Sequence, residues 1–219
     1  MGRLSAAAAL LMILIVAGHA AARSDDPARF SIGVTGGTLG IGPEIAYRFS
    51  ETLGVRGNAT FLSLSHGLNS GDIHYDGRVR LRSGGAMLDL YPFGGGFRVS
   101  AGARINGNDG RVIASPASNV TINGTEYTPA QVGTLRGHAD TREFAPTLTF
   151  GYGGSFKKGI AFGIEAGALF QDRVRIRDFT STSPFIAAAD LEAERRNVQD
   201  DVNDYNIYPI VQFTFGYRF

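Results

Sequence analysis

The chain ends with Ile207-Tyr-Pro-Ile-Val-Gln-Phe-Thr-Phe-Gly-Tyr-Arg-Phe219, in which two kinds of side chain alternate strictly. Apolar residues fill the odd positions, from Ile207 to Phe219, whereas the even positions carry Tyr208, Ile210, Gln212, Thr214, Gly216 and Arg218. A period of two predicts a β-strand with one apolar and one polar face. A strand of this length and pattern is typical of segments that cross a lipid bilayer in a β-barrel.

The same alternation recurs along most of the chain. In residues 73–91 the apolar parity changes at Gly84-Gly85, and a glycine pair at such a change predicts a β-bulge. The segments that alternate in this way are 39–49, 53–66, 73–91, 97–105, 144–152 and 160–177.

The connections between these segments alternate in length, which predicts short turns at one end of a barrel and long loops at the other. Residues 50–52, 92–96 and 153–159 are short connections; 67–72, 114–134 and 179–204 are longer. An even strand count requires one more strand before residue 39. Phe30, Ile32 and Val34 supply it if Gly36-Gly37 forms a turn; the alternative is one long strand over 30–49.

The predicted fold is therefore all-β: an eight-stranded antiparallel transmembrane barrel with short periplasmic turns, longer extracellular loops and one loop helix. The alternative is a secreted β-sandwich or lipocalin-like barrel, which turns its apolar face inward. The polar parity here combines Arg and Glu with Gly and Thr. That composition suits a narrow interior filled with paired charges and small side chains.

Residues 1–22 predict a cleaved signal peptide. Arg3 precedes an apolar run of about a dozen residues, and Ala20 and Ala22 fit an A-x-A cleavage site. The alternative is a membrane anchor, which needs about 20 apolar residues, more than the stretch provides. The predicted organisation is a leader at 1–22 and a barrel at 23–219.

Composition excludes several other classes of protein. The chain has no Cys, so disulfides, thiolate metal sites and cysteine nucleophiles are excluded. With 21 basic and 20 acidic residues it lacks the basic excess of a nucleic-acid-binding protein. No cofactor is predicted.

Phe213, Phe215, Tyr217 and Phe219 resemble the C-terminal signature of bacterial outer-membrane proteins, which the barrel-assembly machinery reads. With the leader and the strand count, the chain resembles small eight-stranded barrels of the OmpA, OmpX and OmpW kind. The segments 37–44 and 91–97 look like those of largely uncharacterised proteobacterial barrels. The resemblance implies the outer membrane of a Gram-negative bacterium, contact with its lipid and lipopolysaccharide, and no particular activity.

Charged residues on the inward parity are the main candidate site. Because an isolated buried charge is costly, we expect them to pair. One reading is a static plug of ion pairs in a barrel barely wide enough for side chains; the other is a gated path for small solutes. The residues are Glu44, Arg48, Arg56, Arg80, Arg82, Asp89, Arg98, Arg104, Glu143, Glu165 and Arg218.

Two sets of residues in or near the loops are of types that could bind a metal ion or catalyse hydrolysis. His66, Asp72, His74 and Asp76 cluster near the 67–72 loop and are ligand types for Zn²⁺ or Cu²⁺, although solvated loop side chains look the same.

A hydrolase would use His66 or His138 as the base and Ser63 or Ser65 as the nucleophile. No sequence spacing selects such a set, and we assign no catalytic or metal-binding residue.

Residues 185–204 predict an acidic helix that starts near Ser183-Pro184, read either as a cation-binding surface or as a solvated lid. Asn123-Gly124 predicts a small hairpin in the 114–134 loop, a surface that could meet an extracellular partner. An aromatic girdle is expected beside the short turns. It comprises Tyr47, Tyr91, Phe93, Tyr152, Phe156 and Phe219.

The leading hypothesis is a non-enzymatic outer-membrane protein with an envelope-structural or surface-interaction role. The alternative is a narrow, porin-like channel for passive uptake of small or apolar solutes. A third is a lipid-modifying enzyme. A plugged lumen favours the first, a continuous lumen the second, and a Ser-His-acid set near the outer leaflet the third.

Overall fold

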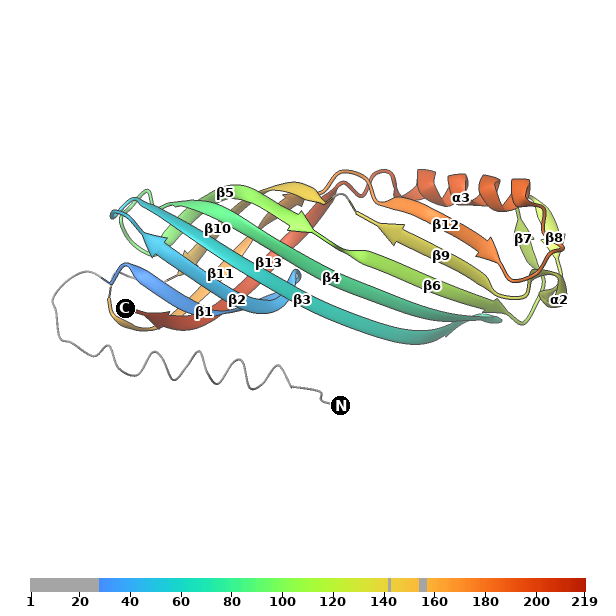
Figure 1. Ribbon diagram of the computed structural model, residues 1–219, viewed down its shortest axis with the longest axis horizontal. Coiled ribbons are helices and arrows are strands. Elements are labelled where there is room, and N and C mark those ends of the chain that lie inside the picture. Colours follow the sequence, from blue (N-terminus) through green and yellow to red (C-terminus); the bar gives the residue numbers. More distant parts are fainter. Residues whose placement is uncertain (1–27, 142, 154–156) are drawn as a thin grey trace, which may run out of the picture.

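The computed structural model describes residues 28–141, 143–153 and 157–219. Figure 1 shows an elongated molecule built almost entirely of antiparallel strands. The predicted leader at 1–22, with Ala20 and Ala22, lies outside the described residues, as does Phe156 of the predicted girdle.

Eight strands close into an antiparallel ring. Around it they follow the order β4-β3-β2-β1-β13-β11-β10-β5, and β5 pairs back with β4. Within the described residues every pairing in the ring is antiparallel. The strands are β1 (Phe30–Gly37), β2 (Gly40–Arg48), β3 (Leu53–Ser70), β4 (Ile73–Leu90), β5 (Phe97–Asn106), β10 (Phe144–Gly153), β11 (Gly159–Phe170) and β13 (Ile207–Arg218).

The small ring forces neighbouring strands very close together on its inner wall. Gly102 of β5 illustrates this, because a Cβ atom there would lie 2.1 Å from the carbonyl oxygen of Ala86 on β4. No side chain fits at that distance, so the inner wall needs glycine at this position.

Beyond the ring, β3 and β4 continue as a long hairpin. Their pairing is unbroken from Leu53 opposite Leu90 to Ser70 opposite Ile73. Residues 83–90 of β4 pair with β5 inside the ring, whereas residues 73–80 pair with β6 (Asp109–Pro116). The sheet continues through β9 (Leu135–Asp140) to β12 (Arg175–Ser181).

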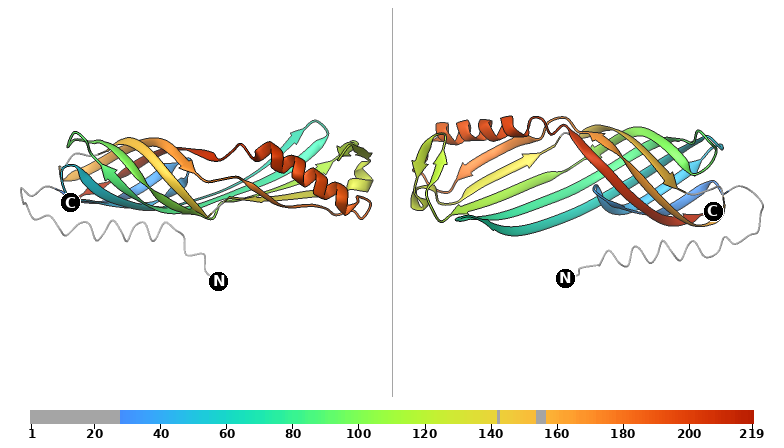
Figure 2. Two further views of the ribbon diagram at one scale, coloured as in Figure 1. Left: turned by 90° about the horizontal axis from the view of Figure 1, so that it is seen from above. Right: turned by 180° about the vertical axis from the view of Figure 1, so that it is seen from behind.

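We call this second part the extension: residues 62–70 of β3 and 73–82 of β4 with β6, β9 and β12. Figure 2 shows it as a flatter sheet projecting from one end of the ring, with α3 (Ala188–Val202) along one side. At its far tip lie β7 (Val120–Ile122), β8 (Thr125–Tyr127) and α2 (Pro129–Val132). Buried Ile122, Val132 and Ile186 form a small core there.

The predicted hairpin within residues 30–49 is present, but its turn is Thr38-Leu39 rather than Gly36-Gly37. Gly37 pairs with Gly40, so both predicted turn glycines belong to β1. The shift places Leu39 inside the ring at 3% exposure, not on the outer face as expected.

The bulge predicted at Gly84-Gly85 is absent. The register of β3 against β4 does not shift there, so the odd residues of β4 stay on one face from Ile73 to Asp89. What changes is which face of β4 is apolar. In the ring the even-numbered residues are apolar, as at Leu88 and Leu90; beyond the ring the odd-numbered ones are, as at Val79 and Leu81.

The apolar alternation over 160–177 belongs to two strands. β11 ends at Phe170, Asp172 has φ of 63°, and β12 begins at Arg175. Alternation continues across this break without a continuous strand. The alternation does not predict β6 or β9: β9 and most of β6 lie between the predicted strands and the 114–134 loop, in residues assigned to neither.

The small hairpin around Asn123-Gly124 is present, with φ of 48° and 79° at these residues. The predicted loop helix is also present as α3, although it starts at Ala188 rather than near Ser183-Pro184. Among the described residues, no helix is long and apolar enough to cross a bilayer.

The two ends of the ring differ as the loop lengths predicted. The β2–β3 and β4–β5 connections and the C-terminus lie together at the end away from the extension (Figure 1). The β1–β2 turn and the whole extension lie at the other end.

Candidate functional site

The interior of the ring holds most of the charges predicted to point inward. Glu44, Arg48, Arg56, Asp89, Arg98, Arg104 and Glu165 are all buried. Arg218 is half-buried and lines the same cavity as Arg98.

Arg56 on β3 is the centre of this interior. Its Nη1 lies 3.2 Å from Glu44 Oε2, its Nε 3.3 Å from Asp89 Oδ2, and its Nη2 2.6 Å from Glu165 Oε2. Ser100 Oγ donates to Asp89 Oδ1 at 2.6 Å. One guanidinium therefore joins carboxylates from three other strands across the lumen.

Arg98 and Arg104 flank this centre. Arg98 Nη2 lies 3.3 Å from Glu165 Oε2, so that Glu165 joins two arginines. Arg104 has neutral hydrogen-bond partners: its Nε donates to Ser83 Oγ and its Nη1 to Asn58 Oδ1, both at 2.7 Å. We call Glu44, Arg56, Asp89, Arg98 and Glu165 the ion-pair cluster.

At the short-turn end, Arg48 closes the lumen. Its guanidinium carbon lies 3.6 Å from the ring centroid of Tyr91, a cation–π contact. Its Nη2 donates to the carbonyl oxygens of Glu51 at 2.6 Å and Gly94 at 3.0 Å. Tyr91 was predicted for the outer girdle, but it is 4% exposed because this contact holds it inside.

At the extension end, the lumen is filled by an apolar plug of Leu39, Ala145, Leu169 and Ile210. The β1–β2 turn carries Leu39 into the ring and is fixed there by Tyr208, whose hydroxyl donates to the carbonyl of Thr38 at 2.6 Å. Apolar side chains thus cover the ion-pair cluster on this side.

Between these parts remains a cavity of about 40 Å³, bordered by Glu44, Arg56, Tyr91, Arg98 and Arg218 among others. One buried water needs about 10–15 Å³ on this measure. The space suits a few waters and is too small for a solute.

Three of the predicted inward charges lie elsewhere. Arg80 and Arg82 are on the even face of β4, the face that carries Leu88 and Leu90 outside the ring. The prediction failed because it assumed a bulge that the strand lacks. Glu143 is exposed, in the connection between β9 and β10, and so precedes the ring wall.

The outside of the ring is apolar all the way around. Leu88, Ile105 and Phe162 are 67%, 68% and 70% exposed, far beyond what a core residue shows. We call this surface the belt. It comprises Ile41, Ile45, Leu53, Phe61, Leu88, Leu90, Val99, Ile105, Phe144, Leu148, Phe150, Ile160, Phe162, Ile164, Val211, Phe213 and Phe215.

Aromatic residues gather beside the short turns. Tyr47, Phe93 and Tyr152 of the predicted girdle are exposed, and Phe219 packs on Phe30 and Tyr217 at centroid distances of 6.0 and 5.0 Å. The C-terminal residues Phe213, Phe215 and Tyr217 share the outer face of β13. β13 pairs with both β1 and β11, so the last strand of the chain lies next to the first one in the ring.

The loop residues with possible chemistry do not converge. His74 Nε2 lies 3.5 Å from Asp76 Oδ2 on one face of β4, whereas His66 is on the opposite face of the hairpin. In the described parts of the chain, no three metal-ligating residues of the His, Asp and Glu types gather.

The Ser and His residues considered for a hydrolase are also separated. Ser65 Oγ accepts from Arg78 Nε at 3.1 Å, and His138 Nδ1 lies 3.6 Å from Asp178 Oδ2 on the distant strands β9 and β12. Within the described residues, no hydrogen bond joins one of these serines to a histidine.

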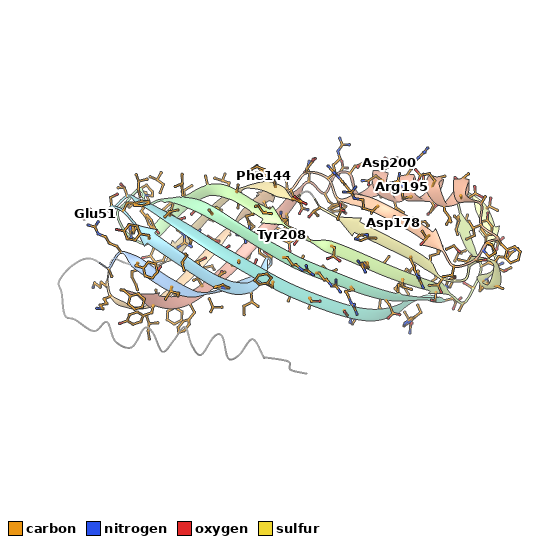
Figure 3. All side chains as sticks on the ribbon, in the orientation of Figure 1. Glu51, Phe144, Asp178, Arg195, Asp200 and Tyr208 are labelled. Carbon is orange, nitrogen blue, oxygen red and sulfur yellow. The ribbon has the colours of Figure 1, made fainter. Side chains whose placement is uncertain are left out.

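The acidic helix α3 lies beside the extension. Figure 3 shows Arg195 and Asp200 there together with Asp178, whereas Glu51 lies at the short-turn end of the ring. Gln199 bonds the free edge of β12: the Ile176 N–H donates to Gln199 Oε1 at 2.8 Å, and Gln199 Nε2 donates to the Val174 carbonyl at 2.8 Å. The helix thus covers an edge that would otherwise be open to another strand.

The fold occurs in known proteins although the sequence is distant from them. No protein-family model and no curated protein sequence matches the chain. The solved structure of CarO2 from Acinetobacter baumannii matches with a TM-score of 0.64 and 16% identity, covering 89% of this chain and all of that one. CarO from the same organism matches with a TM-score of 0.59 and 16% identity, covering 90% and all. The likeness is one of fold.

Proposed function

We propose that the protein is an integral outer-membrane β-barrel of a Gram-negative bacterium, without enzymatic activity. Its ring would span the membrane and its extension would project outside the cell. The observation that carries the proposal is the belt around a ring whose interior is charged. A soluble barrel has the reverse arrangement, and only lipid makes such an apolar exterior favourable.

The fold supports this assignment. The Acinetobacter proteins that share it are outer-membrane proteins. The sequence resemblance to small barrels of the OmpA, OmpX and OmpW kind also implies a location in the outer membrane. The aromatic C-terminal strand would be the segment that the barrel-assembly machinery reads, and outer-membrane lipid with lipopolysaccharide would surround the belt.

Within this class, a structural or surface-interaction role fits better than transport. The ion-pair cluster crosses the lumen, the apolar plug covers one end, and Arg48 with Tyr91 closes the other. Passive uptake of small solutes would need a continuous path, whereas the interior cavity has room for a few waters. The extension is the surface offered to an extracellular ligand.

The test begins with refolding the 23–219 chain into lipid vesicles. We expect a band whose gel mobility changes on heating, as folded barrels show, and protection of the ring from added protease. A chain that stays soluble and monomeric without lipid would contradict the membrane assignment.

Planar-bilayer conductance then separates the two roles. We expect the inserted wild-type protein to give no stable current steps. Reproducible steps would contradict the closed lumen and favour the channel, and E165Q and R98Q variants would then show whether the path runs through the ion-pair cluster.

A further inference from the structure

The arginine row, Arg78, Arg80 and Arg82, lies on the outer face of β4 just beyond the belt. Arg82 is directly opposite Phe61 on β3, and both point outward. Ile105, another belt residue, pairs with Gly84, which is two positions after Arg82 in the sequence. The apolar surface therefore changes to a cationic one within a single step along the strand.

The height of the row matches the headgroup layer. On a strand tilted by about 45°, a step of two residues along the strand rises about 5 Å along the membrane normal. With Phe61, opposite Arg82, as the edge of the belt, Arg80 then lies about 5 Å and Arg78 about 10 Å beyond it. The headgroup region of one leaflet occupies roughly 5–8 Å beyond the hydrocarbon.

The guanidiniums of the row have no acidic partner among the described residues. On β3 they face Ser63 and Ser65, and Arg78 Nε donates to Ser65 Oγ at 3.1 Å. Asp109 is opposite Arg80 in the register, but the carboxylate approaches Arg111, at 4.0 Å. Among the described residues, Arg78, Arg80 and Arg82 thus form no ion pair, although Asp109 shares their face of the sheet.

We propose that the arginine row binds the phosphate groups of the phosphorylated glycolipid in the outer leaflet, lipopolysaccharide. This inference rests on the proposed outer-membrane location. Guanidinium groups bind phosphate oxygens in a bidentate manner, and their attraction to anionic headgroups acts only within a short distance of the surface. Arg111, opposite Arg78 on β6, lies on the same face but is the arginine that Asp109 approaches.

The experiment uses phosphatidylcholine vesicles containing a fluorescent lipid A with both phosphates, or the same lipid A without them. The chain has no cysteine, so a single N69C substitution at the hairpin tip accepts a donor dye for energy transfer. Heat-dependent gel mobility first establishes that each variant is folded in the vesicles. The variants are R80Q/R82Q, R80K/R82K, and R195Q/R196Q on α3 as a control that removes equal charge away from the belt.

We expect the wild type to enrich phosphorylated lipid A and R80Q/R82Q to bind it about 30-fold more weakly, from about a factor of five to six per arginine. R80K/R82K should fall between them, and R195Q/R196Q should match the wild type. Equal binding by R80Q/R82Q and wild type, or equal binding of lipid A without phosphates, would overturn the site. A wild type that does not insert would overturn the membrane assignment as well, and the gel shows that failure separately.

Discussion

The ring and the extension share two strands, β3 and β4, yet they use the faces of those strands in opposite ways. On β4 the ring points Leu88 and Leu90 outward and Asp89 inward, whereas the extension points Arg80 outward and Val79 inward. The backbone pairing is the same throughout. The difference teaches that the surroundings decide which face is apolar: the outer face in the ring, where the proposed location puts lipid, and the inner face of the sheet in the extension.

The largest expected effect tests the interior of the ring. Substituting Arg56 with Met leaves Glu44, Asp89 and Glu165 buried without their central partner. We expect the free energy of unfolding in vesicles to fall by about 3–5 kcal/mol, measured by urea titration of the folded band.

Arg104 is the matched control for that substitution, since it is equally buried but bonds neutral groups. R104M should lower the free energy of unfolding by about 1–2 kcal/mol. If R104M destabilised the ring as much as R56M, the ion-pair cluster would have no special role in its stability.

The second effect compares the surroundings of two leucines with similar exposure. Leu88 in the belt and Leu64 in the extension are 67% and 57% exposed. Arginine at a lipid-facing position near the bilayer centre costs about 2–4 kcal/mol, whereas surface substitutions usually stay within about 0.5 kcal/mol. L88R should therefore be strongly destabilising in vesicles and L64R nearly neutral; equal losses would contradict a membrane boundary between them.

The sequence predicted the ring well for a physical reason. A strand between lipid and a narrow polar lumen must alternate, so β5, β10 and β13 could be located to within about one residue by their side-chain pattern. Glu44, Arg56 and Glu165 followed from the same parity. Which of them pair could not be predicted, because that depends on how strands distant in sequence meet.

The extension was harder to predict because its strands lack that constraint. β6 and β9 have solvent on at least one side and only weak alternation, so the pattern does not predict a strand in either place. The parity change at Gly84-Gly85 was a correct observation with a wrong interpretation. It marks the level at which β4 leaves the ring. The bulge interpretation wrongly placed Arg80 and Arg82 in the lumen.

A third and smaller effect concerns the edge of the extension. Q199A removes the two bonds from Gln199 to the Ile176 N–H and the Val174 carbonyl, and leaves the bond from Arg195 to the Ile176 carbonyl in place. We expect faster hydrogen exchange at the Ile176 amide, corresponding to about 1 kcal/mol of local opening free energy. Amides of β13 in the ring serve as the internal reference. Faster exchange there too would show that the two regions unfold together.

The smallest effect contrasts the exposed charges of the extension with the buried ones of the ring. Hydrogen bonds from Arg195 and Arg196 lower the pKa of Glu192 from 4.5 to about 2. Because the folded pKa is the lower one, the stabilisation is complete above pH 4.5 and is lost as the pH falls towards 2. Glu192 and Arg196 are open to solvent and Arg195 is partly so, which makes the contribution to stability small, but an NMR titration of the Glu192 carboxyl group reports it directly. We expect a midpoint near 2 in the wild type and one closer to 4.5 in R195Q/R196Q. A wild-type midpoint near 4.5 would mean that the α3 pairs do not persist in solution, leaving the ring as the region where ion pairs hold the structure.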